Sequence, residues 1–201
     1  MALPFVSCVS NCYYAPMICI IACGSEKVKY IGAALGDFGE DYRIVPLDEV
    51  HSTNFNEYSG IIISGSPILL IEDEDNYYVN TFTFLKTYER PVLGICFGHQ
   101  VLGLVHGAMI SIGESIKGME EIQAVHESPL FVGIASPAAF DQNHREHITV
   151  PPRFKLLATS ASCENEAMEH ENRCLYGVQF HPETSGDVGK KLLQNFIQLC
   201  E

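Results

Sequence analysis

A cysteine stands between two glycines where an apolar run gives way to a helix-like pattern, in Gly94-Ile95-Cys96-Phe97-Gly98. The glycines allow a sharp strand-to-helix turn, which lifts the side chain of Cys96 out of a sheet. Amide groups at the start of the following helix favour a thiolate there, and the N–H of Phe97 is placed to stabilise an oxyanion. Cys96 is therefore a candidate nucleophile. The alternative is a core cysteine in a tight turn.

A histidine and a glutamate follow a second apolar run, in the segment YGVQFHPE at residues 176–183. Pro182 ends the strand, so His181 lies at its carboxyl end, where α/β sheets place ligand sites. Glu183 can turn back to the imidazole and fix its tautomer. On its own this is an ordinary loop with a surface carboxylate. Together with Cys96 it gives a nucleophile, a base and an orienting acid.

Two further polar segments follow apolar runs, SGSP at residues 64–67 and DQNHREH at residues 141–147. In the first, the N–H of Gly65 or Ser66 could serve as a second oxyanion donor. In the second, Asn143 can both donate and accept, as a substrate carrying ammonium and carboxylate groups requires. The alternatives are a simple turn and a solvated loop.

The elements that must position these residues alternate along the first half of the chain. Short continuous apolar runs predict strands buried on both faces, and 3.6-residue spacing predicts helices. The predicted strands are 17–23, 42–47, 60–64, 91–95, 108–113, 138–142, 154–160 and 174–180, and the predicted helices are 27–39, 76–89, 98–107 and 186–200. The pattern predicts one α/β domain over residues 17–201 with a mostly parallel sheet, preceded by an extension at 1–16.

Charge and cysteine usage exclude several classes of function. The 201-residue chain has 12 Lys+Arg against 25 Asp+Glu, a net charge of -13. Such a surface would repel nucleic acid and anionic membranes. The eight cysteines include no C-x-x-C pair, so we expect free thiols in a reducing cytoplasm rather than disulfides or a metal site. No run is long enough to span a membrane, and the first residues lack the basic segment of a secretory signal.

The segments SGSP, GICFGHQ, QNH and GVQFHPE, in this order, resemble those of class I (triad-type) glutamine amidotransferases over residues 17–200. The resemblance implies a flavodoxin-like α/β domain that hydrolyses the side-chain amide of L-glutamine. Cys96 would form a glutamyl thioester, His181 would protonate the departing ammonia, and Glu183 would orient His181.

The same resemblance implies where the substrate binds. Phe97 and the turn at Gly65 and Ser66 would form the oxyanion hole. The residues that would contact glutamine are Gln100, Asn143, His144, Arg145 and Glu146.

Within this family, ESPLF at 127–131 and GKKLLQNF at 189–196 look most like the glutaminase component of GMP synthetases, in purine biosynthesis. Two segments depart from that branch. The loop reads Gln142-Asn143-His144-Arg145 rather than Ser-His-Gly-Asp, and the oxyanion turn reads Gly-Ser-Pro rather than Gly-Gly-Pro. The partner that we expect is a separate ATP-dependent synthetase subunit, and we expect neither metal nor cofactor in this chain. The alternatives are a stand-alone γ-glutamyl peptide hydrolase and a non-enzymatic regulatory module.

Overall fold

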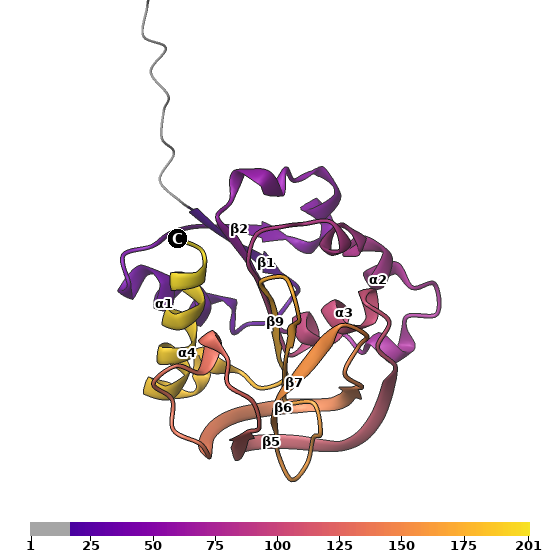
Figure 1. Cartoon of the computed structure of the whole chain (residues 1–201). Coiled ribbons are helices and arrows are strands. Elements are labelled where there is room, and N and C mark those ends of the chain that lie inside the picture. The colour runs from indigo at the N-terminus through magenta and orange to yellow at the C-terminus, as the bar shows by residue number, and fades with distance from the viewer. Residues whose placement is uncertain (1–16) are drawn as a thin grey trace, which may run out of the picture.

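A computed structural model describes residues 17–201, which form one α/β domain around a nine-stranded sheet (Figure 1). The expected fold class is confirmed. The predicted extension at residues 1–16, with Cys8 and Cys12, lies outside the described residues, so the predicted boundary there stays a prediction. The strands are β1 Met17–Ala22, β2 Asp41–Pro46, β3 Gly60–Ile63, β4 Val92–Ile95, β5 Ile110–Ala124, β6 Ala138–Ile148, β7 Phe154–Thr159, β8 Ala167–His170 and β9 Leu175–Val178. The α-helices are α1 Val28–Asp37, α2 Tyr77–Thr81, α3 Phe97–Val105 and α4 Gly186–Leu199.

The sheet has a parallel half and an antiparallel half. Its strand order is β2-β1-β3-β4-β9-β8-β7-β5-β6. The strands from β2 to β9 pair in parallel, and the remaining neighbours pair antiparallel. The carboxyl ends of β3, β4 and β9 therefore meet at one edge of the sheet. The segments that carry Gly65, Cys96 and His181 begin at this edge.

Helices cover both faces of the sheet. In Figure 1, α1 and α4 lie on one side of the strands, and α2 and α3 lie on the other. Successive residues of β1 alternate between the two cores, with Ile18 and Ile20 in one and Cys19 and Ile21 in the other. This alternation explains why the strand reads as a continuous apolar run.

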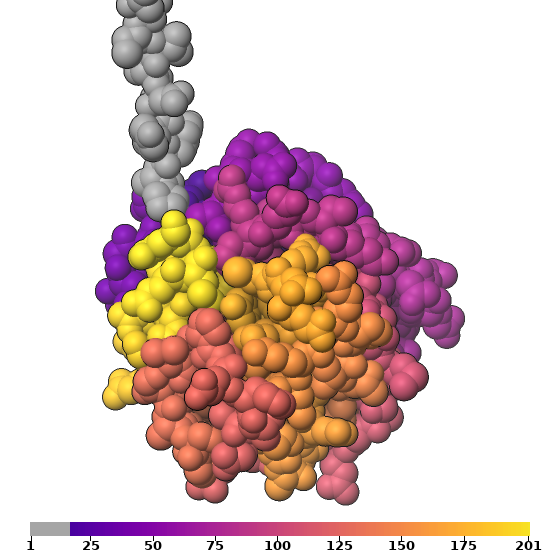
Figure 2. Space-filling model, in the orientation of Figure 1, coloured from indigo at the N-terminus to yellow at the C-terminus, as the bar shows by residue number. Residues whose placement is uncertain are grey.

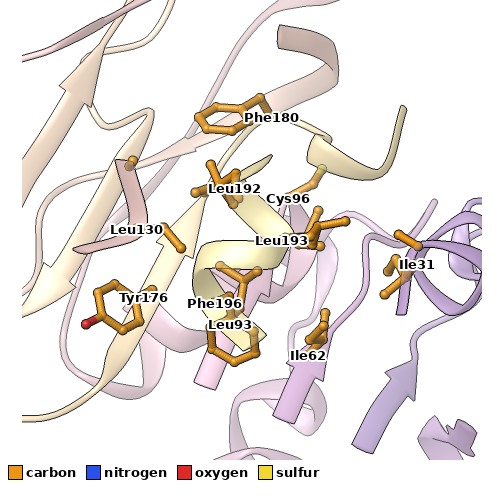
Figure 3. Close-up of a cluster of buried hydrophobic side chains, with 14 of the residues drawn as sticks. Ile31, Ile62, Leu93, Cys96, Leu130, Tyr176, Phe180, Leu192, Leu193 and Phe196 are labelled. Atoms are coloured by element: carbon orange, nitrogen blue, oxygen red, sulfur yellow. The ribbon is translucent and has the colours of Figure 1, made fainter. Parts of the chain in front are cut away.

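The core beneath α4 reaches the predicted nucleophile. Figure 3 shows Leu192, Leu193 and Phe196 of α4 among the side chains of the sheet, with Cys96 at the edge of the same cluster. Cys96 is 5% exposed. The apolar packing fixes the end of β4 and so fixes the base of the turn that carries the thiol.

The helix predicted for residues 76–89 is wrong as a single element. It divides into α2 and a 3₁₀ helix, η4 Thr83–Lys86, with Phe82 between them outside helical geometry. The segment is rich in β-branched and aromatic residues, which propagate a helix poorly. The aromatic ring of Phe82 is fully buried, so tertiary packing decides the local backbone.

Two strands in the antiparallel half are longer than predicted, and β8 was not predicted. The segment 141–147 is not a loop: it lies within β6, which pairs with β5 over most of its length. Its inward residues include Gln142, His144 and Glu146. Because the buried face is itself polar, the alternation that marks a strand is hidden in the sequence. Figure 2 shows the surface that this half of the chain, in salmon and orange, forms beside the C-terminal helix in yellow.

Candidate active site

The backbone turns sharply at Cys96, as the two glycines predicted. Cys96 has φ 52° and ψ -103°, a conformation that costs an L-residue about 1–3 kcal/mol. A Cβ on Gly94 would overlap the carbonyl oxygen of Gly98, and a Cβ on Gly98 would overlap that of Ile63. Neither position has room for a side chain. The strained turn holds Cys96 at the start of α3, between β4 and the helix.

His181 and Glu183 form the second part of the site. The Nδ1 atom of His181 lies 2.8 Å from Oε1 of Glu183, and the side chain of Glu183 is fully buried. Burial by itself would lower the pKa of His181. Hydrogen bonding to Cys96 and Glu183, and their charges, outweigh burial and raise that pKa to about 9. The imidazolium is therefore stabilised beside the side chain of Cys96.

The loop that carries His181 is fixed to β6 by Asp141. The backbone N–H of His181 donates to the carbonyl oxygen of Asp141 at 2.8 Å, and the N–H of Asp141 donates to Oγ of Ser185 at 2.9 Å. The carboxylate of Asp141 accepts hydrogen bonds from Lys27 at 2.8 Å and Thr184 at 2.6 Å. These contacts join the start of α1, β6 and the histidine loop. The Lys27–Asp141 pair was not predicted, because nothing local in the sequence links residues so far apart.

The turn after β3 lies against the side chains of Cys96 and His181. A Cβ on Gly65 would lie 3.0 Å from Cε1 of His181 and 3.7 Å from Cβ of Cys96. The Oγ atom of Ser66 accepts the N–H of Ile68 at 3.1 Å, which shapes the turn. Within residues 17–201, the N–H groups of Ser66 and Phe97 make no hydrogen bond. They are available to an oxyanion.

Two cavities meet at Cys96. One, of about 410 Å³, lies between residues 24–27, the Ser66–Pro67 turn and His181. The other, of about 240 Å³, lies between residues 66–69 and the segment 143–146 of β6, with Gln100 on its wall. Asn143 lines both cavities, and its carbonyl oxygen lies 3.9 Å from Sγ of Cys96. The thiol can thus be reached from two sides.

The predicted substrate contacts divide according to the two faces of β6. Asn143 and Arg145 are exposed, whereas His144 and Glu146 are buried. Both carboxylate oxygens of Glu146 accept backbone hydrogen bonds, from the N–H of Leu70 at 3.0 Å and of Ile71 at 2.7 Å. Its carboxylate is thus already engaged with protein.

The remaining two predicted contacts also have protein partners. His144 lies with Nδ1 3.1 Å from the carbonyl oxygen of Glu146. The side-chain amide of Gln100 donates to the same oxygen at 3.2 Å and to Oε1 of Gln179 at 3.1 Å. Ser115 and Lys117 of β5 also line the smaller cavity, and the sequence pattern did not identify them. They sit in an irregular, exposed strand that carries no motif.

Comparisons with known proteins give the family of this chain. The model for the family "Glutamine amidotransferase class-I" matches residues 19–199. A glutamine-hydrolyzing GMP synthase subunit from Pyrococcus furiosus is 36% identical over 92% of this chain and 98% of its own length.

Solved structures share the fold. A candidate GMP synthase subunit from Thermoplasma acidophilum has a TM-score of 0.84 at 27% identity, covering 94% of this chain and 95% of its own. A glutamine amidotransferase from Thermotoga maritima has a TM-score of 0.74 at 21% identity, over 92% of this chain and 84% of its own, and this likeness concerns the fold alone. The family model matches nearly the whole described chain, and a strained cysteine turn lies beside a His–Glu pair. This chain therefore belongs to the class I glutamine amidotransferases.

Proposed function

We propose that this chain hydrolyses glutamine to glutamate and ammonia, and that it passes the ammonia to a separate ATP-dependent synthetase subunit, in the manner of the glutamine-hydrolysing half of a two-part GMP synthase. The observation that carries the proposal is the strained turn at Cys96 beside the buried pair of His181 and Glu183. The relatives named as glutamine-hydrolyzing GMP synthase subunits, which match over nearly their whole length, support the assignment of the partner.

In the first half of the reaction, Sγ of Cys96 attacks the amide carbonyl of glutamine. The oxyanion is held by the N–H of Phe97 and an N–H of the Gly65–Ser66 turn. When the C–N bond breaks, His181 gives its proton to the leaving nitrogen, and a glutamyl thioester and ammonia result.

In the second half, His181 takes a proton from water, and the resulting hydroxide attacks the thioester carbonyl. The C–S bond breaks, glutamate leaves, and the thiolate and imidazolium are restored. Glu183 holds the ring of His181 in one orientation through both halves. We propose that the α-amino and carboxylate groups of glutamine lie in the smaller cavity, against Asn143, Arg145 and Gln100.

One observation favours a second candidate function. The 410 Å³ cavity on the His181 side of Cys96 is larger than ammonia needs, and it could hold the amino acid released from a γ-glutamyl peptide. The chain would then act without a synthetase. Under either function, we propose that the protein acts in the cytoplasm.

The test compares glutamine with γ-glutamyl dipeptides, following ammonia and free amino acid. We expect turnover of glutamine to exceed that of the dipeptides, and Cys96→Ala to abolish both. Efficient dipeptide cleavage with negligible glutaminase activity would support the peptide hydrolase. Full turnover by Cys96→Ala would exclude both enzymatic proposals.

A further inference from the structure

Another cavity, separate from the two that meet at Cys96, is lined by basic side chains. It opens to the surface beyond the carboxyl end of α3, has a volume of about 640 Å³, and is lined by residues that include Lys86, His106, Arg153, His170 and Arg173. The nine residues of α3 separate it from Cys96 by about 13 Å, at 1.5 Å per residue. Three of the chain's 12 lysines and arginines gather here, although the net charge is -13.

The cavity is formed by segments that are distant in the sequence. On the face seen in Figure 2, the orange surface of the region around residues 150–175 borders the magenta surface of residues 75–107. Arg173 joins the two, because its guanidinium donates to the carbonyl oxygens of Leu85 at 2.9 Å and Lys86 at 3.1 Å. The side chain of Arg173 is therefore held in place by the fold.

The positive charges of this cavity are not neutralised by ion pairs. Within residues 17–201 the salt bridges involve other cations, and none includes Lys86, Arg153 or Arg173. Two acids, Glu89 and Glu171, act on Arg173 and His170 respectively through their charges. Burial first, and then the charges of Arg173 and Arg153, lower the pKa of His170. The cluster repels itself, and an anion would relieve that repulsion.

The backbone at Arg153 is strained. The N–H of Phe154 donates to the carbonyl oxygen of Pro151 at 3.1 Å, closing a turn in which Arg153 has φ 66°. That position of the turn favours glycine, which adopts positive φ without a steric penalty. An arginine kept there at the cost of strain indicates that its side chain is needed in the cavity.

The two histidines supply unused polar atoms. His170 is only 6% exposed, and its Nδ1 accepts the N–H of Asn172 at 3.1 Å, so a proton on Nε2 is free to be donated. The Nδ1 atom of His106 lies 2.9 Å from the carbonyl oxygen of Leu102, and its buried Nε2 has no partner within residues 17–201. Because Nδ1 of His106 must donate to that carbonyl oxygen, its Nε2 is an acceptor, and of the two rings only His170 can offer an N–H to an anion.

We propose that this basic cavity is an anion site that binds the phosphate group of a small ligand. Arginine and lysine recognise phosphate through charge-assisted hydrogen bonds, and an imidazole N–H adds a directional donor. A polyanion such as nucleic acid would meet the acidic remainder of the surface, so the ligand is a single phosphate or a small phosphate ester.

The test uses the whole chain and inorganic phosphate at low ionic strength, measured by calorimetric titration and by the rise in Tm on binding. We expect Arg153→Gly and Lys86→Met each to weaken phosphate binding at least tenfold. Lys29→Gln, which removes an exposed cation on α1, should leave the affinity within twofold. Arg153→Gly should also raise Tm in the absence of phosphate, because glycine relieves the strain.

The outcomes separate binding in the cavity from general charge effects. Phosphate that binds wild type and all three variants alike, or no binding to wild type, overturns the proposal. Ribose 5-phosphate, titrated in parallel, identifies the source of the phosphate group. At least tenfold tighter binding than inorganic phosphate indicates an ester ligand, and equal binding indicates free phosphate.

Discussion

At the scale of single residues, the site separates two tasks that the sequence pattern had joined. In the proposed reaction Cys96 and His181 do the chemistry, whereas Glu183 is buried and contacts His181. Because the carboxylate and the thiol together raise the pKa of His181 to about 9, the ring is protonated at neutral pH and ready to give its proton to the amide nitrogen that leaves as ammonia.

Replacing Glu183 by glutamine tests this division of tasks. The amide keeps the size of the side chain but removes the charge, so the pKa of His181 should fall from about 9. His181 then loses its proton at lower pH, and the basic limb of kcat/KM should move to lower pH, with kcat reduced about 10²-fold or more. A pH profile of glutamine hydrolysis measures both effects. An unmoved basic limb would mean that Glu183 does not set the protonation of His181.

At the scale of elements, glycines decide how closely α3 approaches the sheet. Gly98 in α3 meets the carbonyl oxygen of Ile63 in β3, and this contact requires the absence of a Cβ. The glycine-cysteine-glycine pattern predicted this turn correctly because both its causes, steric room and helix start, are local. The parallel strands were predicted for a similar reason, since each is a short apolar run.

The matched pair Gly98→Ala and Gly36→Ala tests the packing at this turn. The added methyl at Gly98 would overlap the backbone of β3, so we expect a loss of about 2 kcal/mol or more in the free energy of unfolding, together with loss of activity. At Gly36, in α1, an added Cβ meets nothing within 4 Å, so alanine should stabilise by about 0.5–1 kcal/mol. Urea unfolding of both variants gives the comparison. Equal effects would refute the steric explanation.

The site's second wall could not be predicted in the same way. The side chain of Glu146 lies on the buried face of β6 and holds the backbone of Leu70 and Ile71, 76 and 75 positions away. Glu146 thus joins the two walls of the smaller cavity, and this can be seen only once β6 and the segment after β3 are placed side by side. The same holds for the contact of Lys27 with Asp141, which depends on a register between elements that no local pattern encodes.

Glu146→Gln tests whether Glu146 positions the oxyanion turn. Glutamine accepts one backbone N–H where the carboxylate accepts two, so the segment after the turn should loosen and kcat should fall about tenfold. Alkylation of Cys96 by iodoacetamide, which needs no oxyanion hole, should continue at the wild-type rate. Glu169→Gln is the control, because Glu169 is also buried but binds Lys155 and Ser128 instead. A raised KM with unchanged kcat would instead make Glu146 a substrate contact.

At the scale of the whole molecule, the two halves of the sheet are stabilised differently. The parallel half is buried under apolar side chains, whereas the antiparallel half buries Gln142, Asn165 and Glu166. Glu166 accepts hydrogen bonds from Gln142 at 2.8 Å and Ser160 at 2.7 Å, and one of its oxygens has no partner within residues 17–201.

Among the described residues, no helix is long and apolar enough to cross a membrane.

The buried carboxyl group of Glu166 makes the stability of the protein depend on pH. Burial raises the pKa of Glu166 to about 7 from an ordinary 4.5, so the folded protein favours its neutral form. A group whose pKa is raised on folding stabilises below its unfolded pKa, and that contribution is lost as pH rises from about 4.5 through 7. Glu166→Gln stays neutral and escapes this loss. Its free energy of unfolding relative to wild type should therefore rise by about 2–3 kcal/mol between about pH 4.5 and pH 8. Urea unfolding at the two pH values measures the difference, and a variant whose advantage is the same at both would show that folding does not raise the pKa of Glu166.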